Sequence, residues 1–383
     1  MLAQGGPSGK RRWMEIVSVQ SRKARKSFVD LPRRLMGEMP AFVPPLTFSE
    51  VKRIDPRRNP FFAHAQAGFW LAMEGGVPIG RISATRDELS LEYQQDGTGF
   101  FGHPLARDEA TLHALLGVAE DFLRAKGLHQ MRGPIELSTN YTCGLQVTTF
   151  DLPPMLEMNQ HPPGMDAWHK SYGLEGVKDL LAFRIREEEL DLQRLQRVRA
   201  ISQKRSKARI RTLDLKRFPQ EVQVLHKVYV QAWEKNFGFA PMSKEEFEAA
   251  AKDFKTILDP RLCLVAEQEG EAVGFLLALP DAHQGFRACN GRLFPFGIFQ
   301  FLSAMRKVHS LRVLTLGVIP KLRGKGLDAR LILELIERGL QAGYNEAELS
   351  WVLEDNLPMV KPILDLGGHE AQRYRLYEKP LSQ

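Results

Sequence analysis

The sequence predicts an α/β protein made of two related halves, and three observations support this prediction. The chain has 383 residues, which exceeds the size of about 250–300 residues at which a single hydrophobic core stops growing. Its composition, 43% hydrophobic and 26% charged, is that of a globular protein. Two pairs of segments resemble each other at one common separation of about 194 residues, which is the pattern of a duplication.

The first repeated pair consists of two strand-turn-strand segments. "AMEGGVPIGRISA" at 72–84 aligns with "AEQEGEAVGFLLA" at 266–278, so that Gly76 is matched by Gly270 and Gly80 by Gly274. Apolar runs on both sides of a glycine turn predict a β-hairpin in each half.

The second repeated pair is a glycine turn followed by a strand. "SYGLEGVKDLLAFRI" at 171–185 aligns with "DLGGHEAQRYRLYEK" at 365–379, where Gly173 is matched by Gly367 and Phe183 by Tyr377. Because both pairs occur in the same order, we expect the two halves to fold alike.

The net charge of +7 favours an anionic partner, such as a phosphorylated ligand or an anionic membrane. We expect no nucleic-acid partner, because the basic runs lack interleaved aromatic residues. The cysteines Cys143, Cys263 and Cys289 form no CxxC pair, which indicates a reducing compartment. No signal peptide and no apolar run of about 18 residues is present, so we expect a cytoplasmic protein, with peripheral contact at the inner membrane face left open.

A basic glycine turn, "PKLRGKGLD" at 320–328, lies between an apolar strand and an amphipathic helix. Glycines at the start of a helix let N–H groups approach a phosphate, and the helix dipole adds about half a positive charge. A Walker A loop is excluded, because Lys325 is followed by Gly326 and not by Ser or Thr. Gly324, Gly326 and Ala329 match a dinucleotide pattern, but fewer than about 60 residues follow, too few for the rest of that fold.

The stretch "VIPKLRGKGL" resembles the R-x-x-G-x-[GA] signature of the GNAT acyltransferase superfamily, with Arg323 and Gly326 at its first and fourth positions. The resemblance implies two GNAT-like α/β halves, each a mixed, mostly antiparallel sheet flanked by helices. It also implies acyl-CoA as co-substrate, without a metal. The implied acyl-CoA-binding residues are Leu316, Gly317, Val318, Arg323, Gly324, Lys325, Gly326, Leu327, Asp328 and Asn356.

The chain departs from the superfamily pattern at two positions. Asp328 occupies the sixth position of the signature, where Gly or Ala is usual, so a carboxylate would lie beside the pyrophosphate unless it caps the helix. Ile363 stands where the superfamily commonly has a Tyr that protonates the leaving thiolate.

The phrases "FVPPL", "NPFFAHA" and "GPIELSTNYTCGL" look like those of large two-half bacterial GNAT-like proteins, a group that includes acyl-CoA-dependent ceramide synthases. This resemblance implies a basic N-terminal extension at 1–50, a degenerate half at 51–188, a basic linker at 189–219 and a catalytic half at 220–383.

Transfer of an acyl group to an amine needs a base for the amine and an acid for the thiolate. Glu354 and Asp355, next to Asn356, are the candidate bases, with helix capping as the alternative interpretation. Tyr377, or Tyr374 on the opposite face of its strand, is the candidate acid.

Aromatic residues are the candidate substrate contacts. Trp233 and Phe237 fall where the superfamily covers its acceptor site. Phe299 shares a helical face with Phe296 and Leu302, which fits a core helix as well as an acyl-binding or lipid-facing surface.

We therefore expect an acyl-CoA-dependent N-acyltransferase, with a long-chain donor and a sphingoid-base-like amine as the sharper hypothesis. Acetylation of a small amine and non-catalytic acyl-CoA binding are the alternatives.

Overall fold

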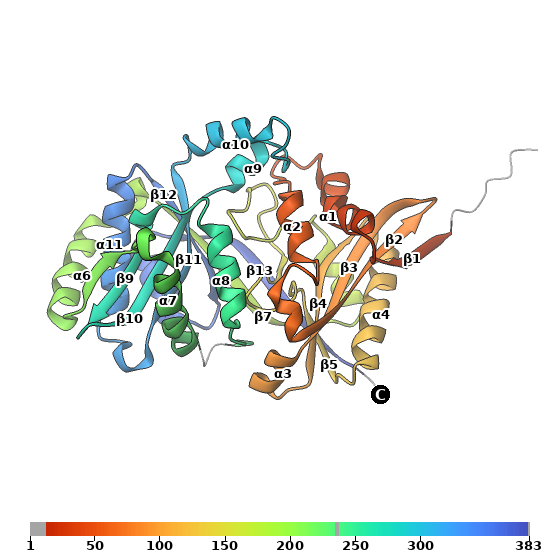
Figure 1. Ribbon diagram of the computed structural model, residues 1–383, viewed down its shortest axis with the longest axis horizontal. Coiled ribbons are helices and arrows are strands. Elements are labelled where there is room, and N and C mark those ends of the chain that lie inside the picture. Colours follow the sequence, from red (N-terminus) through yellow and green to blue (C-terminus); the bar gives the residue numbers. More distant parts are fainter. Residues whose placement is uncertain (1–12, 234–236, 382–383) are drawn as a thin grey trace, which may run out of the picture.

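The computed structural model describes residues 13–233 and 237–381 (Figure 1). The first half of the chain contributes these elements in order: β1 (Met14–Ser18), α1 (Arg22–Met36), α2 (Thr47–Arg53), β2 (Ala65–Glu74), β3 (Val77–Asp87), α3 (Glu88–Gln94), β4 (Thr98–Ala106), α4 (Glu109–Ala125), β5 (Gln130–Gly133), β6 (Leu145–Gln146), α5 (Met165–Ser171) and β7 (Glu175–Arg186).

The second half repeats the central part of this order after a connecting helix. Its elements are α6 (Leu192–Arg205), β8 (Arg209–Thr212), α7 (Phe218–Trp233), α8 (Lys244–Phe254), β9 (Cys263–Gln268), β10 (Glu271–Pro280), α9 (His283–Ala288), α10 (Gly297–Met305), β11 (Ser310–Val318), α11 (Leu327–Gln341), β12 (Glu346–Leu353), α12 (Leu357–Asp365) and β13 (His369–Pro380).

One sheet runs through both halves, in the order β1-β2-β3-β4-β5-β13-β7-β12-β11-β10-β9-β8. Its pairs are antiparallel apart from β4 with β5 and β11 with β12, which are parallel. The expected mixed, mostly antiparallel sheet flanked by helices is thus confirmed.

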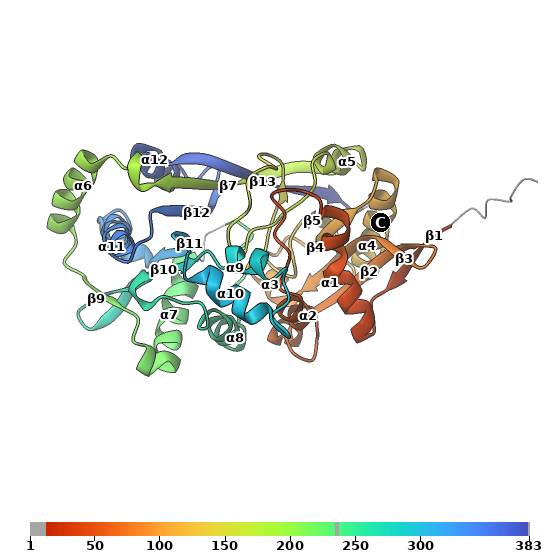
Figure 2. The same cartoon turned by 90° about the horizontal axis from the view of Figure 1, so that it is seen from above.

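The two halves exchange their last strands at the centre of the sheet. β13, from the end of the chain, pairs with β5 of the first half, whereas β7 pairs with β12 of the second half. β7 and β13 also pair with each other, and both run along the upper edge of the molecule in Figure 2. The strands that follow the two repeated glycine turns are therefore the exchanged strands.

The repeated segments form the predicted hairpins. Gly76 lies in the turn between β2 and β3 with φ +81°, and Gly270 lies in the turn between β9 and β10 with φ +84°. Side chains other than glycine rarely adopt this left-handed conformation, which explains why both turns contain glycine.

Each half has its own hydrophobic core, under the helix that follows its central strand. In the first half α4 buries Leu112, Leu115 and Leu116 against β2–β4. In the second half α11 buries Leu331 and Leu335 against β9–β11.

Segments expected to lie outside the halves carry regular structure. In the predicted extension, β1 pairs antiparallel with β2 along its whole length, and α1 packs on β3. In the predicted linker, α6 packs on α11 and β8 pairs with β9. None of the described helices is long and apolar enough to cross a membrane.

Candidate functional site

The parallel strands β11 and β12 diverge in the second half. They pair only over residues 310–313 and 346–349, whereas β10 accompanies β11 as far as Val318. The backbone of residues 315–318 therefore has a ladder partner on one edge only. The predicted acyl-CoA residues Leu316, Gly317 and Val318 lie in this diverging part, where N–H and C=O groups are available to a ligand.

The glycine turn joins this strand to α11 as the sequence predicts. Gly324 and Gly326 have φ +69° and +80°, and Gly326 is the N-cap of α11 without any side-chain capping bond. The first four N–H groups of a helix have no partner within it. An uncapped N-terminus of a 15-residue helix, entered through glycines, can receive a phosphate group.

The charged residues of the turn have different surroundings. Arg323 folds back, donating to the backbone carbonyls of Ala232 on α7 and Val318 on β11. Lys325 is exposed. Asp328 is also exposed and does not cap the helix, so the capping alternative foreseen for it is wrong.

The end of α6 adjoins the turn and adds positive charge. A side chain at Gly326 would place its Cβ 3.3 Å from Cα of Ser202 and 3.6 Å from Cβ of Arg205. Lys204, Arg205 and Lys207 are exposed in this segment. The basic linker therefore lies beside the turn, where its charges favour an anionic ligand.

A cavity of about 770 Å³ opens between the halves and reaches the diverging strands. Leu314 and Thr315 of β11 and Trp351 and Leu353 of β12 form one wall. Most of the lining is apolar and comes from α7, α8, β10, α9 and α10 in the second half and from α2 and the 139–143 segment in the first.

Of the three predicted substrate residues, two line this cavity and one does not. Trp233 and Phe237 line it, and Trp233 packs on Gly317, where a Cβ would lie 2.3 Å from the indole ring. Phe299 does not line the cavity and is 67% exposed on α10. The interpretation of the Phe299 face as a core face is wrong, because Phe296 and Leu302 are exposed as well.

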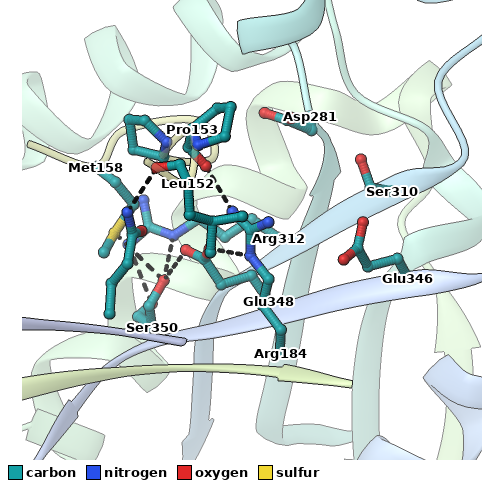
Figure 3. A network of polar contacts seen from close by, with 12 residues as sticks. Leu152, Pro153, Met158, Arg184, Asp281, Ser310, Arg312, Glu346, Glu348 and Ser350 are labelled. Atoms are coloured by element: carbon teal, nitrogen blue, oxygen red, sulfur yellow. Dashed lines mark hydrogen bonds and ion pairs between the residues drawn. The ribbon is translucent and has the colours of Figure 1, made fainter. Parts of the chain in front are cut away.

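A buried polar network lies at the base of the divergence (Figure 3). Arg184 of β7 donates to Glu348 of β12 (3.1 Å), Ser350 donates to the same carboxylate (2.8 Å), and Arg312 of β11 donates to Ser350 Oγ (2.9 Å). Arg312 also donates to the carbonyl of Leu156, from the first half. The network thus ties the exchanged strand and a first-half loop to the diverging strands.

The predicted catalytic residues are dispersed. Glu354 accepts the backbone N–H of Asp179 (3.0 Å), and Asp355 pairs with Lys178 (2.7 Å). Both residues are exposed, and neither lines the cavity. Asn356 is exposed beside them as the N-cap of α12, without a side-chain capping bond.

The two candidate acids are fully buried. Tyr377 donates to Asp166 and stacks on His169 with ring centroids 5.2 Å apart. Tyr374 donates to Gln372 (3.2 Å). Burial raises the pKa of both phenols, and neither residue lines the cavity.

Sequence reasoning missed the carboxylates that do line the cavity. Glu246 bonds His64 (2.8 Å), which also bonds Asp87 (3.0 Å). Burial opposes protonation of His64, but the hydrogen bonds to Asp87 and Glu246 outweigh it and raise the pKa to about 9. Glu157, in a first-half loop, pairs with Arg53 through both oxygens (2.9 and 3.0 Å). These partners are far apart in the sequence, so no local pattern could have revealed them.

The described ranges, 13–233 and 237–381, contain no group of three or more His, Cys, Asp or Glu side chains that could hold a metal ion.

Comparison with known proteins connects this site to a family. Residues 222–362 match the model of the acetyltransferase (GNAT) family. A bacterial ceramide synthase from Caulobacter vibrioides (strain NA1000 / CB15N) is 34% identical over 376 residues, which cover 96% of this chain and 98% of that protein. Protein YghO from Escherichia coli (strain K12) is 30% identical over 363 residues, 93% of each chain.

A solved structure shares the fold of the whole chain. The tandem GNAT protein from the clavulanic acid biosynthesis pathway aligns with a TM-score of 0.59 and 14% identity, over 97% of this chain and 99% of that one.

The duplicated fold and the family match define an acyl-CoA-dependent N-acyltransferase with two related halves. The chain belongs to the GNAT superfamily, within the two-half group that includes the Caulobacter ceramide synthase. Acyl-CoA is its co-substrate and an amine its acceptor.

Proposed function

We propose that this enzyme transfers a long acyl chain from CoA to the amine of a sphingoid-base-like lipid and so forms a ceramide-like amide. The observation that carries the proposal is the apolar cavity of about 770 Å³ that meets the diverging strands. Cavities of about 300–1,000 Å³ enclose ligands much larger than an acetyl group and a small amine. The similarity to a protein named ceramide synthase supports the same substrate class.

The donor would bind across the second half. The pyrophosphate would contact the turn formed by Arg323, Gly324, Lys325, Gly326, Leu327 and Asp328, next to the uncapped start of α11. The thioester and its pantetheine arm would follow the free backbone edge at Leu316, Gly317 and Val318, with Asn356 at the opposite strand end.

The reaction joins nitrogen to carbon and releases a thiol. The ammonium form of the acceptor first loses a proton, and its nitrogen then attacks the thioester carbonyl. The C–S bond breaks, the nitrogen loses a second proton, and the thiolate takes up one, so that amide, free thiol and one proton result. Glu157 and Glu246 line the cavity and are better placed to accept these protons than Glu354 and Asp355, which contact β7.

A donor series tests the substrate class. Thiol release and amide mass are measured with acyl-CoAs from acetyl to hexadecanoyl, each with a long-chain amino alcohol and with a small diamine. We expect turnover to rise with acyl length and to require the long-chain acceptor. Efficient acetyl transfer to the diamine, with no long-chain turnover, would contradict the proposal.

A cavity variant sharpens this test. Leu314→Trp places a larger side chain at the wall beside the diverging strands and should reduce use of the hexadecanoyl donor about tenfold more than use of acetyl-CoA. Val177→Trp, on an exposed residue of β7 outside the cavity, is the matched control and should change neither.

We further propose a cytoplasmic enzyme that touches the inner membrane face through α10 and the loop before it. These elements lie across the top of Figure 1, between the two halves. Phe294, Phe296 and Phe299 are 83, 74 and 67% exposed. The basic residues Arg292, Arg306 and Lys307 are exposed in the same segment. Exposed aromatics with flanking positive charge suit an anionic bilayer surface.

Vesicle sedimentation tests the membrane contact. Combined serine substitution of Phe294, Phe296 and Phe299 should weaken binding to phosphatidylglycerol vesicles at least about tenfold. Serine substitution of Leu192 and Ile201, which are 64 and 53% exposed on α6, is the control and should leave binding unchanged. Equal loss in both variants would contradict the assigned surface.

A further inference from the structure

A second, smaller cavity of about 150 Å³ lies in the first half, and its lining is unusually polar for an interior space. It is lined by residues of α1, α2, β3, β4 and the 154–161 loop, and by His283 and Phe286 of α9 from the second half. Its polar and charged lining residues are Ser49, Glu50, Arg53, Arg81, His103, Glu136, Thr142, Glu157, Asn159, Gln160, His161 and His283.

The charges around this cavity are unequal. Three carboxylates, Glu50, Glu136 and Glu157, face two guanidiniums, Arg53 and Arg81. Arg53 pairs with Glu157 (2.9 Å) and with Glu50 (3.4 Å), whereas Glu136 accepts a hydrogen bond from Thr142. Burial raises the pKa of Glu50 and of Glu136. A cationic group inside the cavity would stabilise the charged forms of these two carboxyl groups.

Two buried polar atoms in the lining have no hydrogen-bond partner among the described residues. His103 is 5% exposed, and its Nδ1 bonds Ser83 Oγ (2.9 Å), but its Nε2 has no hydrogen bond and lies 3.5 Å from Glu136. Nε of Arg81 is also without a partner. Unpaired buried polar atoms are costly in a purely structural cluster, and they point to a ligand that bonds them.

The small cavity adjoins the large one. Arg53 and Glu157 line both, together with Leu46, Ser49 and Phe286. The segment between Ile135 and Cys143, whose ends form a β-bridge, places Glu136 in the small cavity and Asn140 in the large one. A single ligand could therefore extend from one cavity into the other.

The junction also lies near the reacting strands. Leu156, which precedes Glu157, accepts the hydrogen bond of Arg312 (2.5 Å), and Arg312 is the residue of β11 just before the last pair with β12. A group held at Glu157 would thus lie near the base of the divergence, from which the proposed thioester edge at Leu316, Gly317 and Val318 continues along β11.

We propose that the small cavity holds the polar head of the acceptor, with the amine at Glu157 and the neighbouring hydroxyl or carbonyl oxygen between Glu136 and His103. The alkyl tail then occupies the apolar cavity. This inference rests on the proposed function and names the acceptor class more closely, an amine flanked by a hydrogen-bonding oxygen. A space of about 150 Å³ suits a small polar head group.

The test compares two acceptors of equal chain length, a 2-amino-1,3-diol and a plain n-alkylamine, with the full-length protein and a long-chain acyl-CoA. Glu136→Gln should lower kcat/KM for the amino diol roughly tenfold to hundredfold, because a charge-assisted hydrogen bond to its hydroxyl is lost. The same variant should leave kcat/KM for the alkylamine and the Kd for acyl-CoA unchanged.

His103→Asn is the second variant, because asparagine tolerates the left-handed backbone (φ +53°) at this position. It should show the same selective loss for the amino diol. Glu92→Gln, on an exposed glutamate of α3, is the matched control and should behave as wild type. Equal loss for both acceptors, or no loss for either in a folded variant, would overturn the assignment.

Failure of the proposed function gives a different result. If the wild-type protein transfers acyl groups to neither acceptor, that function fails, and the cavity is then tested by direct calorimetric binding of the amino diol. If the wild-type protein binds the amino diol and Glu136→Gln abolishes this binding, the head-group assignment stands. If the wild-type protein does not bind the amino diol, the assignment is overturned.

Discussion

The two halves begin their central helices in opposite ways. In the first half, Asp108 caps α4 by accepting the backbone N–H and the hydroxyl of Thr111, so a carboxylate already occupies the helix start. In the second half, Gly326 leaves the start of α11 without a side-chain cap. The same strand-to-helix connection is therefore closed in one half and open to a phosphate in the other.

The largest effect is expected when the second half is made to resemble the first. Gly326→Asp adds a carboxylate at the helix start and should weaken acyl-CoA binding about a hundredfold or more. Gly326→Asn has nearly the same shape without the charge and should lose about tenfold or less, since asparagine tolerates positive φ. Calorimetric titration with acyl-CoA measures both.

The reverse change in the first half is the control for this comparison. Asp108→Ala should leave acyl-CoA affinity unchanged and lower the free energy of unfolding by about 1 kcal/mol through loss of the cap. A weaker acyl-CoA complex in this variant would show that the first half also binds the donor.

The ion contacts of His64 join the halves, and they predict a pH dependence. Its folded-state pKa of about 9 exceeds the usual 6.5, so the stabilisation is complete below pH 6.5 and is lost as the pH rises through 9. We expect a loss of about 2 kcal/mol in the free energy of unfolding across this range. Urea unfolding at pH 6 to 9.5 measures it, and an unchanged slope in His64→Gln would contradict the assignment.

A comparison of Arg323 with Lys325 distinguishes a residue that shapes the turn from one that only contributes charge. Arg323→Ala removes its bonds to the carbonyls of Ala232 and Val318 and should raise KM for acyl-CoA about tenfold while lowering the melting temperature by a few degrees. Lys325→Ala, on an exposed lysine of the same turn, should raise KM without a thermal shift. Identical behaviour of the two variants would rule out the shaping role.

The smallest effect is expected at Asp328. Because its carboxylate is exposed near the proposed pyrophosphate site, Asp328→Ala should tighten acyl-CoA binding about twofold to threefold at low salt. The gain should disappear at 1 M salt, where charges are screened beyond about 3 Å. A loss of affinity would mean that Asp328 orders the turn.

Much of the second half could be predicted from local sequence. The glycine turn, the strand before it and the helix after it lie where the pattern places them, because each depends on neighbouring residues. The two hairpins around Gly76 and Gly270 were predictable for the same reason. The family resemblance placed Trp233 and Phe237 at the acceptor site. Both line the large cavity, and their contact with the acceptor stays a prediction.

The exposed face of Phe299 could not be predicted, since an apolar helical stripe looks the same whether a core or a membrane covers it. The carboxylates proposed for the acceptor site also escaped the sequence reasoning. Glu246 meets His64 only after the two halves come together, and Glu157 meets Arg53, 104 residues away, only after the first half has folded.

The sequence by itself determined that the chain has two related α/β halves and that only the second carries a basic glycine turn before its central helix, because hairpins, turns and helix starts are set by nearby residues. The tertiary structure alone decided that β7 and β13 exchange between the halves. Both strands follow a glycine turn at corresponding positions of the repeat, so local sequence does not say which half each strand joins. The pairing depends on contacts between residues that are distant in the sequence. That exchange brings Leu180 of β7 and Leu376 of β13 into the lining of the large cavity, where we place the alkyl tail of the acceptor.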